Sequence, residues 1–175
     1  MNNSSLLLGV MSGTSLDGID IVLIDQNNQS IKIIEFIHMP YNENIKKDFL
    51  SLHSGQNSDL EHSIQMSISH AKITANGIKK ILRKHKLKAE DVKCIGYHGQ
   101  TIRHYPKSGY SVQLGNANLL AELTNITVVS DFRNRDIVAG GQGAPLVPAF
   151  HNEFFSKKNK NRIIINIGGI SNITY

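Results

Sequence analysis

The segment 9–20 holds the densest group of residues that could do chemistry. Its central part combines glycines, hydroxyls and a carboxylate in the order Gly13, Thr14, Ser15, Leu16, Asp17, Gly18. Glycines allow backbone N–H groups to come close to a ligand, and successive N–H groups in a turn attract anions. Because the carboxylate of Asp17 would repel a bare phosphate, we expect Mg²⁺ between the two. The pattern predicts a phosphate-binding turn, and an ordinary polar hairpin turn is the alternative.

Three later stretches place polar side chains beside apolar runs. His98 follows the run 92–97, Asp131 and Arg133 follow the run 126–130, and a small-residue loop occupies 139–145. Since ligands of open α/β sheets bind beyond the carboxyl ends of parallel strands, we expect these residues to share one cleft. A histidine with a structural role and a local Asp131–Arg133 ion pair are the alternatives.

Hydrophobic patterning predicts the elements that must position these residues. Apolar runs on both sides of the glycine loop predict two strands joined by a tight turn, and 31–38 predicts a third antiparallel strand. Further strands are expected at 92–97, 110–115 and 126–130, with helices at 43–52, 59–84 and 116–123. Pro145 or Pro148 suits the first turn of another helix.

The helix predicted over 59–84 is the clearest of these elements. Ser58 and Glu61 fit a capping box at its start. Its apolar stripe is Leu60, Ile64, Ile68, Ala71, Ala75, Ile78 and Leu82. His62 and His70 lie off this stripe, so we expect both to be exposed.

Four motifs in order resemble the anhydro-N-acetylmuramic acid kinases, members of the sugar kinase/Hsp70/actin superfamily. The first is Met11–Asp20, and the second is Gly96–Thr101. The third runs from Ser130 through Arg133 to 140–148, and the fourth is 166–174. The resemblance covers the chain from Leu7 to Tyr175.

The resemblance implies an α/β fold of the actin-like ATPase (ribonuclease H-like) type, with a mixed sheet and flanking helices. It also implies ATP and Mg²⁺ as cofactors. We infer Asp17 as the metal residue because it lies in the turn whereas Asp20 lies in the strand, and Asp20 stays open as the alternative. The implied nucleotide-binding residues are Gly13, Thr14, Ser15, Leu16, Asp17, Gly18, Ile19 and Asp20. The implied substrate-binding residues are His98, Asp131, Arg133, Gly141, Gln142 and Gly143.

The reaction implied by the resemblance opens the anhydro ring of 1,6-anhydro-N-acetylmuramic acid and phosphorylates the freed hydroxyl. The product is N-acetylmuramic acid 6-phosphate, which serves cell-wall recycling. The aspartate that acts as base in the family belongs to a motif beyond Tyr175, so the catalytic residue of this sequence is unknown. The chain therefore resembles an N-terminal half that needs a C-terminal half, and a homodimer is compatible with it.

The pattern at the end of the chain predicts a division into two parts. Residues 1–161 would form the phosphate-loop and sugar-binding domain, and 162–175 the opening hairpin of a second ATPase domain.

Two other interpretations of the function stay open at this point. One is a non-catalytic or partner-dependent half, and the other is a hydrolase with Ser15 as nucleophile beside His98 and Asp131. The hydrolase interpretation lacks the second glycine of a nucleophile elbow.

Composition narrows the class of protein. The net charge of +5 is modest, and the basic clusters lack interleaved aromatic residues, so we expect no nucleic-acid partner. Lone Cys94 reads as a buried strand residue rather than a nucleophile. No apolar run approaches the length of a membrane span, and no signal peptide is evident, so we expect no membrane partner and a cytoplasmic location.

Overall fold

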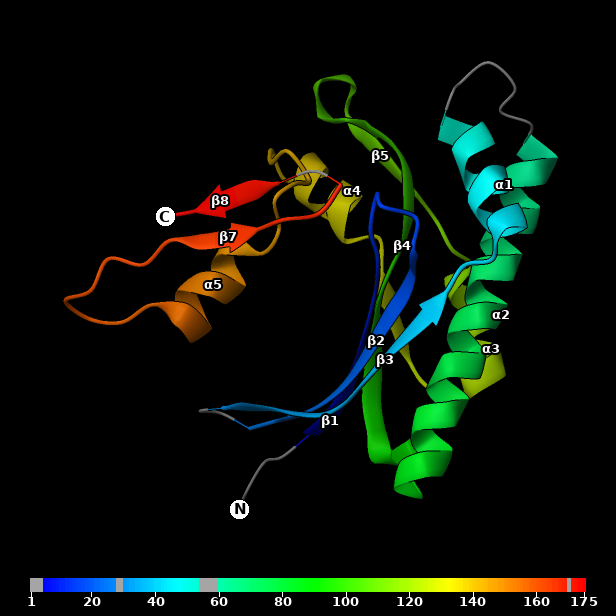
Figure 1. Ribbon diagram of the computed structural model, residues 1–175, viewed down its shortest axis with the longest axis horizontal. Coiled ribbons are helices and arrows are strands. Elements are labelled where there is room, and N and C mark those ends of the chain that lie inside the picture. Colours follow the sequence, from blue (N-terminus) through cyan, green and yellow to red (C-terminus); the bar gives the residue numbers. More distant parts are fainter. Residues whose placement is uncertain (1–4, 28–29, 54–59, 170) are drawn as a thin grey trace.

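The chain forms one mixed β-sheet with helices on both faces (Figure 1). The computed structural model describes residues 5–27, 30–53, 60–169 and 171–175. The sheet has the order β3-β2-β1-β4, and β4 pairs at its far side with both β5 and β6. The strands are β1 (Ser5–Ser12), β2 (Gly18–Gln26), β3 (Ile31–Pro40), β4 (Val92–Tyr105), β5 (Tyr110–Leu114) and β6 (Val128–Ser130). The predicted fold class is confirmed.

The first three strands form the predicted antiparallel meander. β1 pairs with β2 from Ser5↔Gln26 to Met11↔Asp20, and β2 pairs with β3 along its whole length. The alternation of the sequence explains the core, because Ile19, Ile21 and Leu23 of β2 are fully buried on one face. The turn between β1 and β2 is the glycine-hydroxyl loop.

Strand β4 is longer than the sequence predicted. We expected it to end at Tyr97 and to present His98 at its end, but the strand continues to Tyr105. It runs parallel to β1 as far as Gln100 and then pairs antiparallel with β5. Gly99, at φ +73°, lies where β4 changes partner, with an irregular register between Val10 and Ser12 of β1. His98 therefore sits inside a strand, just before a bulge.

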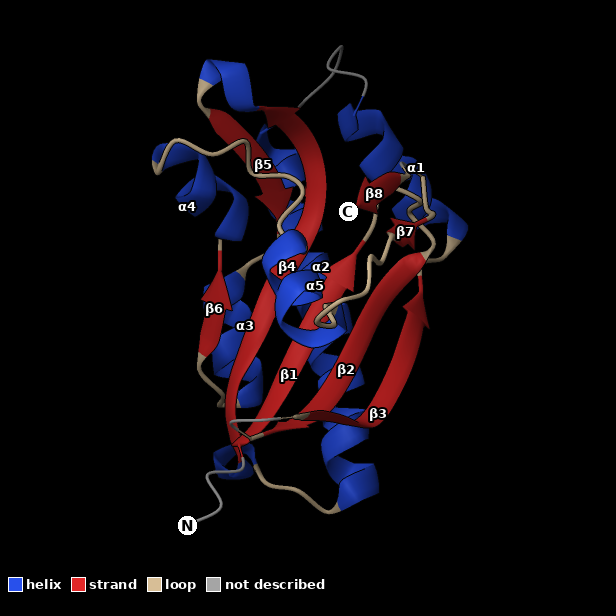
Figure 2. Cartoon of the chain, turned by 90° about the vertical axis from the view of Figure 1, so that its left-hand side faces the viewer, coloured by secondary structure: helices blue, strands red, loops and turns tan. Residues whose placement is uncertain are grey.

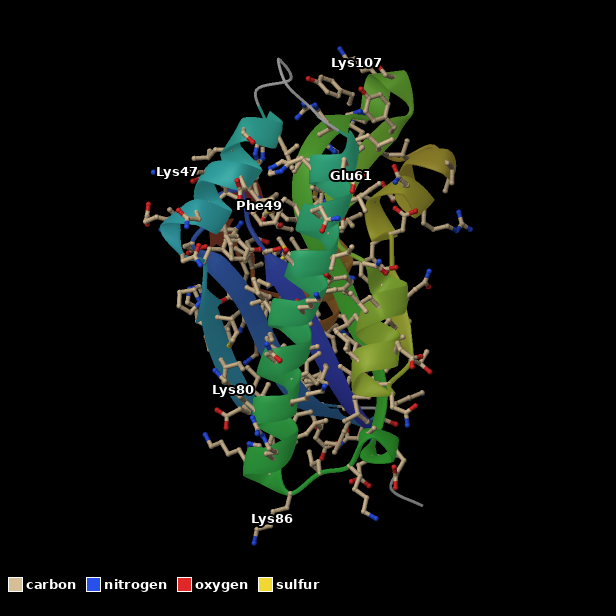
Figure 3. All side chains as sticks on the ribbon, turned by 90° about the vertical axis from the view of Figure 1, so that its right-hand side faces the viewer. Lys47, Phe49, Glu61, Lys80, Lys86 and Lys107 are labelled. Atoms are coloured by element: carbon tan, nitrogen blue, oxygen red, sulfur yellow. The ribbon has the colours of Figure 1, made fainter. Side chains whose placement is uncertain are left out.

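Helix α2 (Leu60–His85) and helix α3 (Ala117–Thr124) cover one face of the sheet. Gly77 lets α2 approach the sheet closely, because a Cβ there would lie 2.5 Å from Ile21 Cδ1. Asn116 caps α3 as predicted, its side chain accepting a hydrogen bond from Leu119 N. Figure 3 views this helical side, where Glu61 and Lys80 lie on α2 and Lys86 follows its end.

The buried stripe of α2 differs from the predicted one. Leu60 and Ile64 are exposed, whereas His70 is buried with only 1 % relative exposure. The expectation that His70 is exposed is thus wrong, and His62 is half-buried. Met66, His70 and Thr74 continue at the same spacing of four toward the sheet, so two polar residues belong to the core face. The predicted cap at Ser58 lies outside the described residues.

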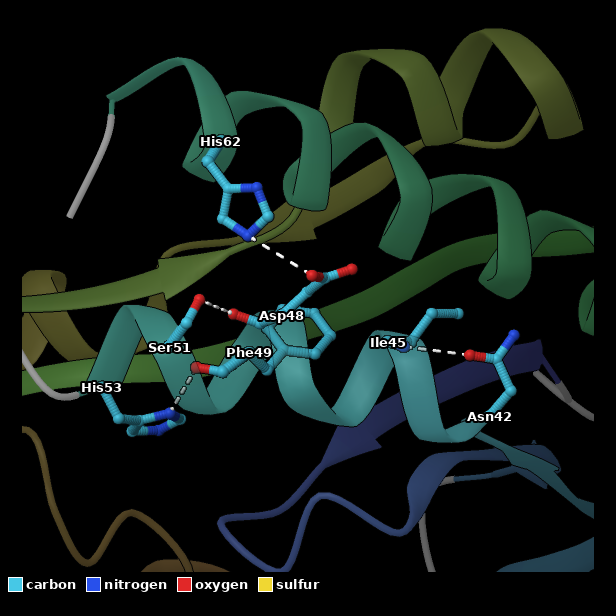
Figure 4. A network of polar contacts seen from close by, with 7 residues as sticks. All are labelled: Asn42, Ile45, Asp48, Phe49, Ser51, His53 and His62. Carbon is cyan, nitrogen blue, oxygen red and sulfur yellow. Dashed lines mark hydrogen bonds and ion pairs between the residues drawn. The ribbon is translucent and has the colours of Figure 1, made fainter. Parts of the chain in front are cut away.

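Helix α1 (Glu43–His53) lies beside the upper part of α2 (Figure 4). Asn42 Oδ1 accepts a hydrogen bond from Ile45 N at 2.9 Å and so caps its first turn. His62 of α2 faces Asp48 of α1 across 3.8 Å. At the other end, Arg103 Nη1 of β4 donates to the carbonyls of Leu52 and His53. Helix α1 is therefore fixed to the same strand that carries His98.

The opposite face of the sheet carries helices α4 (Phe132–Val138) and α5 (Pro148–Phe155), with α5 in front of β1 and β4 (Figure 2). The sequence did not predict α4. Short 3₁₀ turns occupy Ala89–Asp91 and Pro106–Ser108. Strands β7 (Ile164–Asn166) and β8 (Asn172–Thr174) pair as a separate hairpin, and the division of the chain at residue 161 stays a prediction. Among the described residues, no helix is long and apolar enough to cross a membrane.

Candidate active site

The glycine-hydroxyl loop is a tight turn between β1 and β2. Its backbone closes with Leu16 N donating to Gly13 O at 3.3 Å. Leu16 is buried with φ +54°, and it anchors the turn to the core. Thr14, Ser15 and Asp17 are exposed around it. The turn thus presents small polar side chains and main-chain groups on a fixed base, which is the geometry that an anion site requires.

The two carboxylates of this region have different surroundings. The Ser15 hydroxyl donates to Asp17 Oδ1 at 2.8 Å, and this hydrogen bond lowers the pKa of Asp17. Nearby His38 lowers that pKa further by its charge. Asp20 lies within β2 and pairs with His38 Nδ1 at 2.7 Å. Asp17 is therefore an ionised carboxylate in the turn, whereas Asp20 already has a partner.

This donor set fits Mg²⁺ held by a nucleotide better than a metal held by protein ligands alone. No group of three His, Cys, Asp or Glu side chains that could enclose a metal occurs in the described part of the chain. Mg²⁺ commonly uses one or two carboxylates and completes its shell with phosphate oxygens and water. Asp17 is the residue placed to supply such a carboxylate.

The turn of the β7–β8 hairpin lies against this loop. A Cβ on Gly169 would be 2.8 Å from Thr14 Oγ1 and 3.3 Å from Ser15 N. The absence of a side chain at Gly169 therefore allows the second glycine turn to approach the first. The two segments that share the pattern of strand, glycine turn and strand meet at one place.

On the sugar side, His98 joins two of the predicted residues. Its Nε2 atom accepts a 2.9 Å hydrogen bond from Arg133 Nε, and Arg133 Nη1 donates to Gly143 O at 2.6 Å. Burial and, to a smaller extent, the charge of Arg133 lower the pKa of His98 to about 4. A neutral ring whose Nδ1–H donates to Gly99 O leaves Nε2 as the acceptor for Arg133. His98, Arg133 and Gly143 form one cluster, as the sequence predicted.

A cavity of about 280 Å³ lies beside this cluster. His98 and Asp131 line it, whereas Arg133 lies outside its lining. Asp131 does not form the local ion pair with Arg133; its Oδ1 accepts from Asn134 Nδ2 at 2.8 Å. The other lining residues are Tyr97, Gly99, Ser111, Val112, Gln113, Gly115, Ser130 and Asn134. Hydroxyls, amides and one carboxylate around a small cavity suit a polyhydroxylated ligand.

Gln113 adds an acceptor to this wall. Its Nε2 donates to Ser111 Oγ at 2.7 Å, while its buried Oε1 has no hydrogen-bond partner among the described residues. A buried acceptor without a donor is costly, so a donor from a ligand or water would be favourable here.

The loop predicted at Gly141, Gln142 and Gly143 is fixed by Asp136. Asp136 Oδ2 accepts from Gly143 N at 2.7 Å, and its backbone oxygen accepts from Gly141 N. A Cβ on Gly141 would fall 2.1 Å from Asp136 Oδ2, so a side chain there would have to displace the Asp136 carboxylate. Gln142 is exposed and Gly143 is buried. Asp136 therefore holds the loop.

Gln100 and Ser12, which were not among the predicted site residues, connect the glycine-hydroxyl loop and the end of β1 to the strand that carries His98. Gln100 Nε2 donates to Gly13 O at 3.0 Å. The Ser12 hydroxyl donates to Gly99 O at 2.9 Å. Both residues lie inside the motifs that carry the family resemblance. The sequence does not show that they are buried, and this is why they were not selected.

The hydrolase interpretation gains no support from the geometry. Ser15 Oγ donates to Asp17, and both ring nitrogens of His98 are engaged by Gly99 and Arg133. A general base must have a free lone pair directed at the proton of its nucleophile. His98 and Ser15 do not form such a pair here.

Known proteins resemble this chain over nearly all of its length. The family model described as anhydro-N-acetylmuramic acid kinase matches residues 5–175. A protein of that name from Pseudomonas fluorescens is 48% identical over 170 residues, covering 97% of this chain and 47% of the relative. One from Pseudomonas putida is 47% identical over 170 residues with the same coverage. One from Nitrosomonas europaea is 47% identical over 169 residues, covering 95% of this chain and 47% of the relative.

The chain spans about half the length of the curated relatives that it matches, and it corresponds to their N-terminal half. The glycine-hydroxyl loop, the His98 strand and the Arg133–Gly143 cluster all lie within the matched region. The chain belongs to the anhydro-N-acetylmuramic acid kinase family.

Proposed function

We propose that this chain supplies the nucleotide-phosphate loop and the sugar pocket of an anhydro-N-acetylmuramic acid kinase. The reaction would use ATP, Mg²⁺ and one water molecule. Water would open the anhydro ring of 1,6-anhydro-N-acetylmuramic acid, and the γ-phosphoryl group of ATP would pass to the freed 6-hydroxyl, giving N-acetylmuramic acid 6-phosphate and ADP. Such a kinase would act in peptidoglycan recycling in the cytoplasm. The catalytic base and the rest of the nucleotide site would come from a C-terminal half, and the complete enzyme could form a homodimer.

The observation that carries the proposal is a hydrogen bond between the strand beside the cavity and the loop proposed to bind phosphate. Gln100, which follows the sugar-side bulge, donates to the carbonyl of Gly13, the first residue of the phosphate loop. Phosphoryl transfer depends chiefly on positioning and on stabilising charge, so a phosphate loop and an acceptor pocket on adjoining strand ends suit it.

Each group would have a distinct task. Backbone N–H groups of 13–18 would bind phosphate oxygens, and Asp17 would hold Mg²⁺, which neutralises phosphate charge when bound. Asp131, Asn134 and Gln113 would orient hydroxyl and amide groups of the sugar. Arg133, held by His98 and Gly143 just outside the cavity lining, would supply positive charge beside the pocket for the carboxylate of the sugar.

The test joins this chain at Tyr175 to the remaining half of the Pseudomonas fluorescens relative. The purified protein is incubated with ATP, Mg²⁺ and 1,6-anhydro-N-acetylmuramic acid, and the product is identified by mass spectrometry. We expect a product with one added phosphate and one added water, and Asp17→Asn as the matched control should reduce its formation. Failure of a folded joined protein to phosphorylate the sugar would support the alternative of a non-catalytic, partner-binding half.

A further inference from the structure

The burial of the polar side chain of His70 in the core is not explained by packing alone. His70 lies on α2 with 1 % relative exposure, among the rings of Tyr41, Phe49 and Tyr97. Burial lowers its pKa to about 3, so the ring is neutral at physiological pH and carries one N–H. Burying a polar ring at such a position costs free energy of folding unless each ring nitrogen has a hydrogen-bond partner.

Hydrogen bonds assign the direction of each proton around His70. The Ser12 hydroxyl has one proton, which it donates to Gly99 O, so Ser12 Oγ accepts from His70 Nε2–H at 2.9 Å. His70 Nδ1 then accepts from the Tyr97 hydroxyl at 2.5 Å. Every polar atom of the ring is thereby satisfied, and only the Nε2–H tautomer allows it.

The same carbonyl continues the chain of bonds to the sugar side. Gly99 O accepts from Ser12 and also from His98 Nδ1 at 2.6 Å, which fixes His98 as the Nδ1–H tautomer. His98 Nε2 is therefore the acceptor for Arg133 Nε, and Arg133 holds Gly143. One uninterrupted series of hydrogen bonds connects α2, the end of β1, the bulge of β4 and helix α4.

We propose that His70 is a positioning residue for the sugar pocket. Through Ser12 it fixes the position of the Gly99 carbonyl to which His98 donates, and thereby the orientation of His98 and the guanidinium of Arg133. The role in sugar binding rests on the proposed function. The hydrogen-bond network itself can be tested without measuring kinase activity. His70 is outside the residues that line the cavity, so it acts through others.

The first experiment measures the network by NMR on the joined protein, independently of its activity. Selective ¹⁵N labelling of histidine and arginine reports the tautomers of His70 and His98 and the exchange of the Arg133 Nε–H. We expect neutral Nε2–H at His70 and neutral Nδ1–H at His98 at pH 6. In Ser12→Ala and His70→Phe, we expect the Arg133 Nε–H to exchange about tenfold faster, since one net hydrogen bond is worth up to this factor.

Two further variants separate positioning from general loss of stability. His70→Gln keeps a donor and an acceptor at a similar separation, and it should restore most of the slow exchange. Thr124→Val removes a buried hydroxyl of α3 that donates to Leu120 O, away from the network, and it should leave Arg133 unchanged. If His70→Phe does not fold, Ser12→Ala decides the question. Unchanged exchange at Arg133 in Ser12→Ala would overturn the inference.

The second experiment uses the kinase assay of the joined protein. We expect Ser12→Ala and His70→Phe to raise KM for the sugar about tenfold, with partial recovery in His70→Gln. If the joined wild-type protein is inactive, the proposed function fails while the NMR result still judges the network. If the kinase is active and the KM for the sugar is unchanged in Ser12→Ala, positioning by His70 is wrong and the proposed function stands.

Discussion

Arg133 Nε donates a 2.9 Å hydrogen bond to His98 Nε2, so a cationic side chain of α4 is held by a neutral histidine of β4. Its second bond, to Gly143 O, fixes the plane of the guanidinium. Lysine lacks the planar fork that donates to both acceptors from two separate nitrogens. For the joined kinase we expect Arg133→Lys to raise KM for the sugar about tenfold, consistent with loss of a charge-assisted bond.

The matched control for this prediction is Arg135→Lys, an exposed arginine on the same helix. It should leave steady-state kinetics unchanged. An equal effect of the two substitutions would show that the orientation of Arg133 set by His98 does not govern sugar binding.

The phosphate loop leads to a prediction that separates its two acidic residues. Asp17 lies in the turn with a pKa lowered by the Ser15 hydroxyl, while Asp20 pairs with His38. In the joined kinase, Asp17→Asn should lower kcat on the order of 100-fold, because a charge aimed at the transferring phosphate is lost. Asp20→Asn should cost far less. Near-normal turnover of Asp17→Asn at saturating Mg²⁺ would remove Asp17 from the mechanism.

The two buried neutral histidines predict a loss of stability in mild acid. The pKa of His70 is lowered to about 3 and that of His98 to about 4, whereas unfolded histidine titrates near 6.5. Below that pH the unfolded chain binds a proton at each ring and the folded chain does not. Stability is therefore fully present above the unfolded pKa and is lost as the pH falls.

For the pair, we expect the free energy of unfolding to fall by about 3 kcal/mol between pH 6.5 and pH 5.0, measured by chemical denaturation. His70→Gln should remove about half of this pH dependence. His62→Gln, a substitution at a half-buried histidine of the same helix, should keep it. A stability that does not change across this range would mean that both rings become charged inside the fold.

These histidines also show where sequence reasoning was sufficient and where it was not. The meander of β1 to β3, the length of α2 and the loop ends were predictable, because alternation, helical spacing and glycine turns are local signals. The burial of His70 was missed because the helical pattern counts only apolar residues as core positions. It cannot show that a polar ring finds hydrogen-bond partners inside the core. The length of β4 was missed because its second half is stabilised by pairing with β5.

The cluster of His98, Arg133 and Gly143 could be predicted as a neighbourhood but not as a set of bonds. Strand ends and glycine loops indicate which residues meet. Whether Arg133 pairs with Asp131 or with His98 depends on the left-handed conformation of Asp131 and on helix α4. Neither feature has a clear local signal in the sequence.

Gly77 gives a prediction about packing. A methyl group there would lie 2.5 Å from Ile21 Cδ1, so α2 would have to move away from β2. We expect Gly77→Ala to lower the free energy of unfolding by about 1–3 kcal/mol, despite the better helix propensity of alanine. Lys80→Ala, on the exposed side of the same helix, should change it by less than about 0.5 kcal/mol. Equal stability of the two variants would contradict the close approach.

The exposed apolar side chains of the β7–β8 hairpin predict that the isolated chain aggregates. Ile165 and Ile173 are opposite each other in the hairpin and are 60% and 66% exposed. Such an apolar surface favours association. We expect the 175-residue chain to aggregate and to lack kinase activity, and joining the C-terminal half should improve both. Ile165→Lys with Ile173→Lys should raise the solubility of the isolated chain, measured by light scattering, without restoring activity. Robust turnover by the 175-residue chain would require a base within it.

The carbonyl of Gly99, which accepts from both Ser12 and His98, belongs to the main chain. Replacing the side chains of its partners one at a time leaves this atom in place. Gly99→Ala would disturb far more than the carbonyl, because a Cβ at φ +73° would lie 2.6 Å from Leu114 O. An ester in place of the amide between Gly99 and Gln100 would weaken the carbonyl as an acceptor without adding a side chain. Side-chain substitution alone therefore cannot isolate the contribution of the acceptor that Ser12 and His98 share.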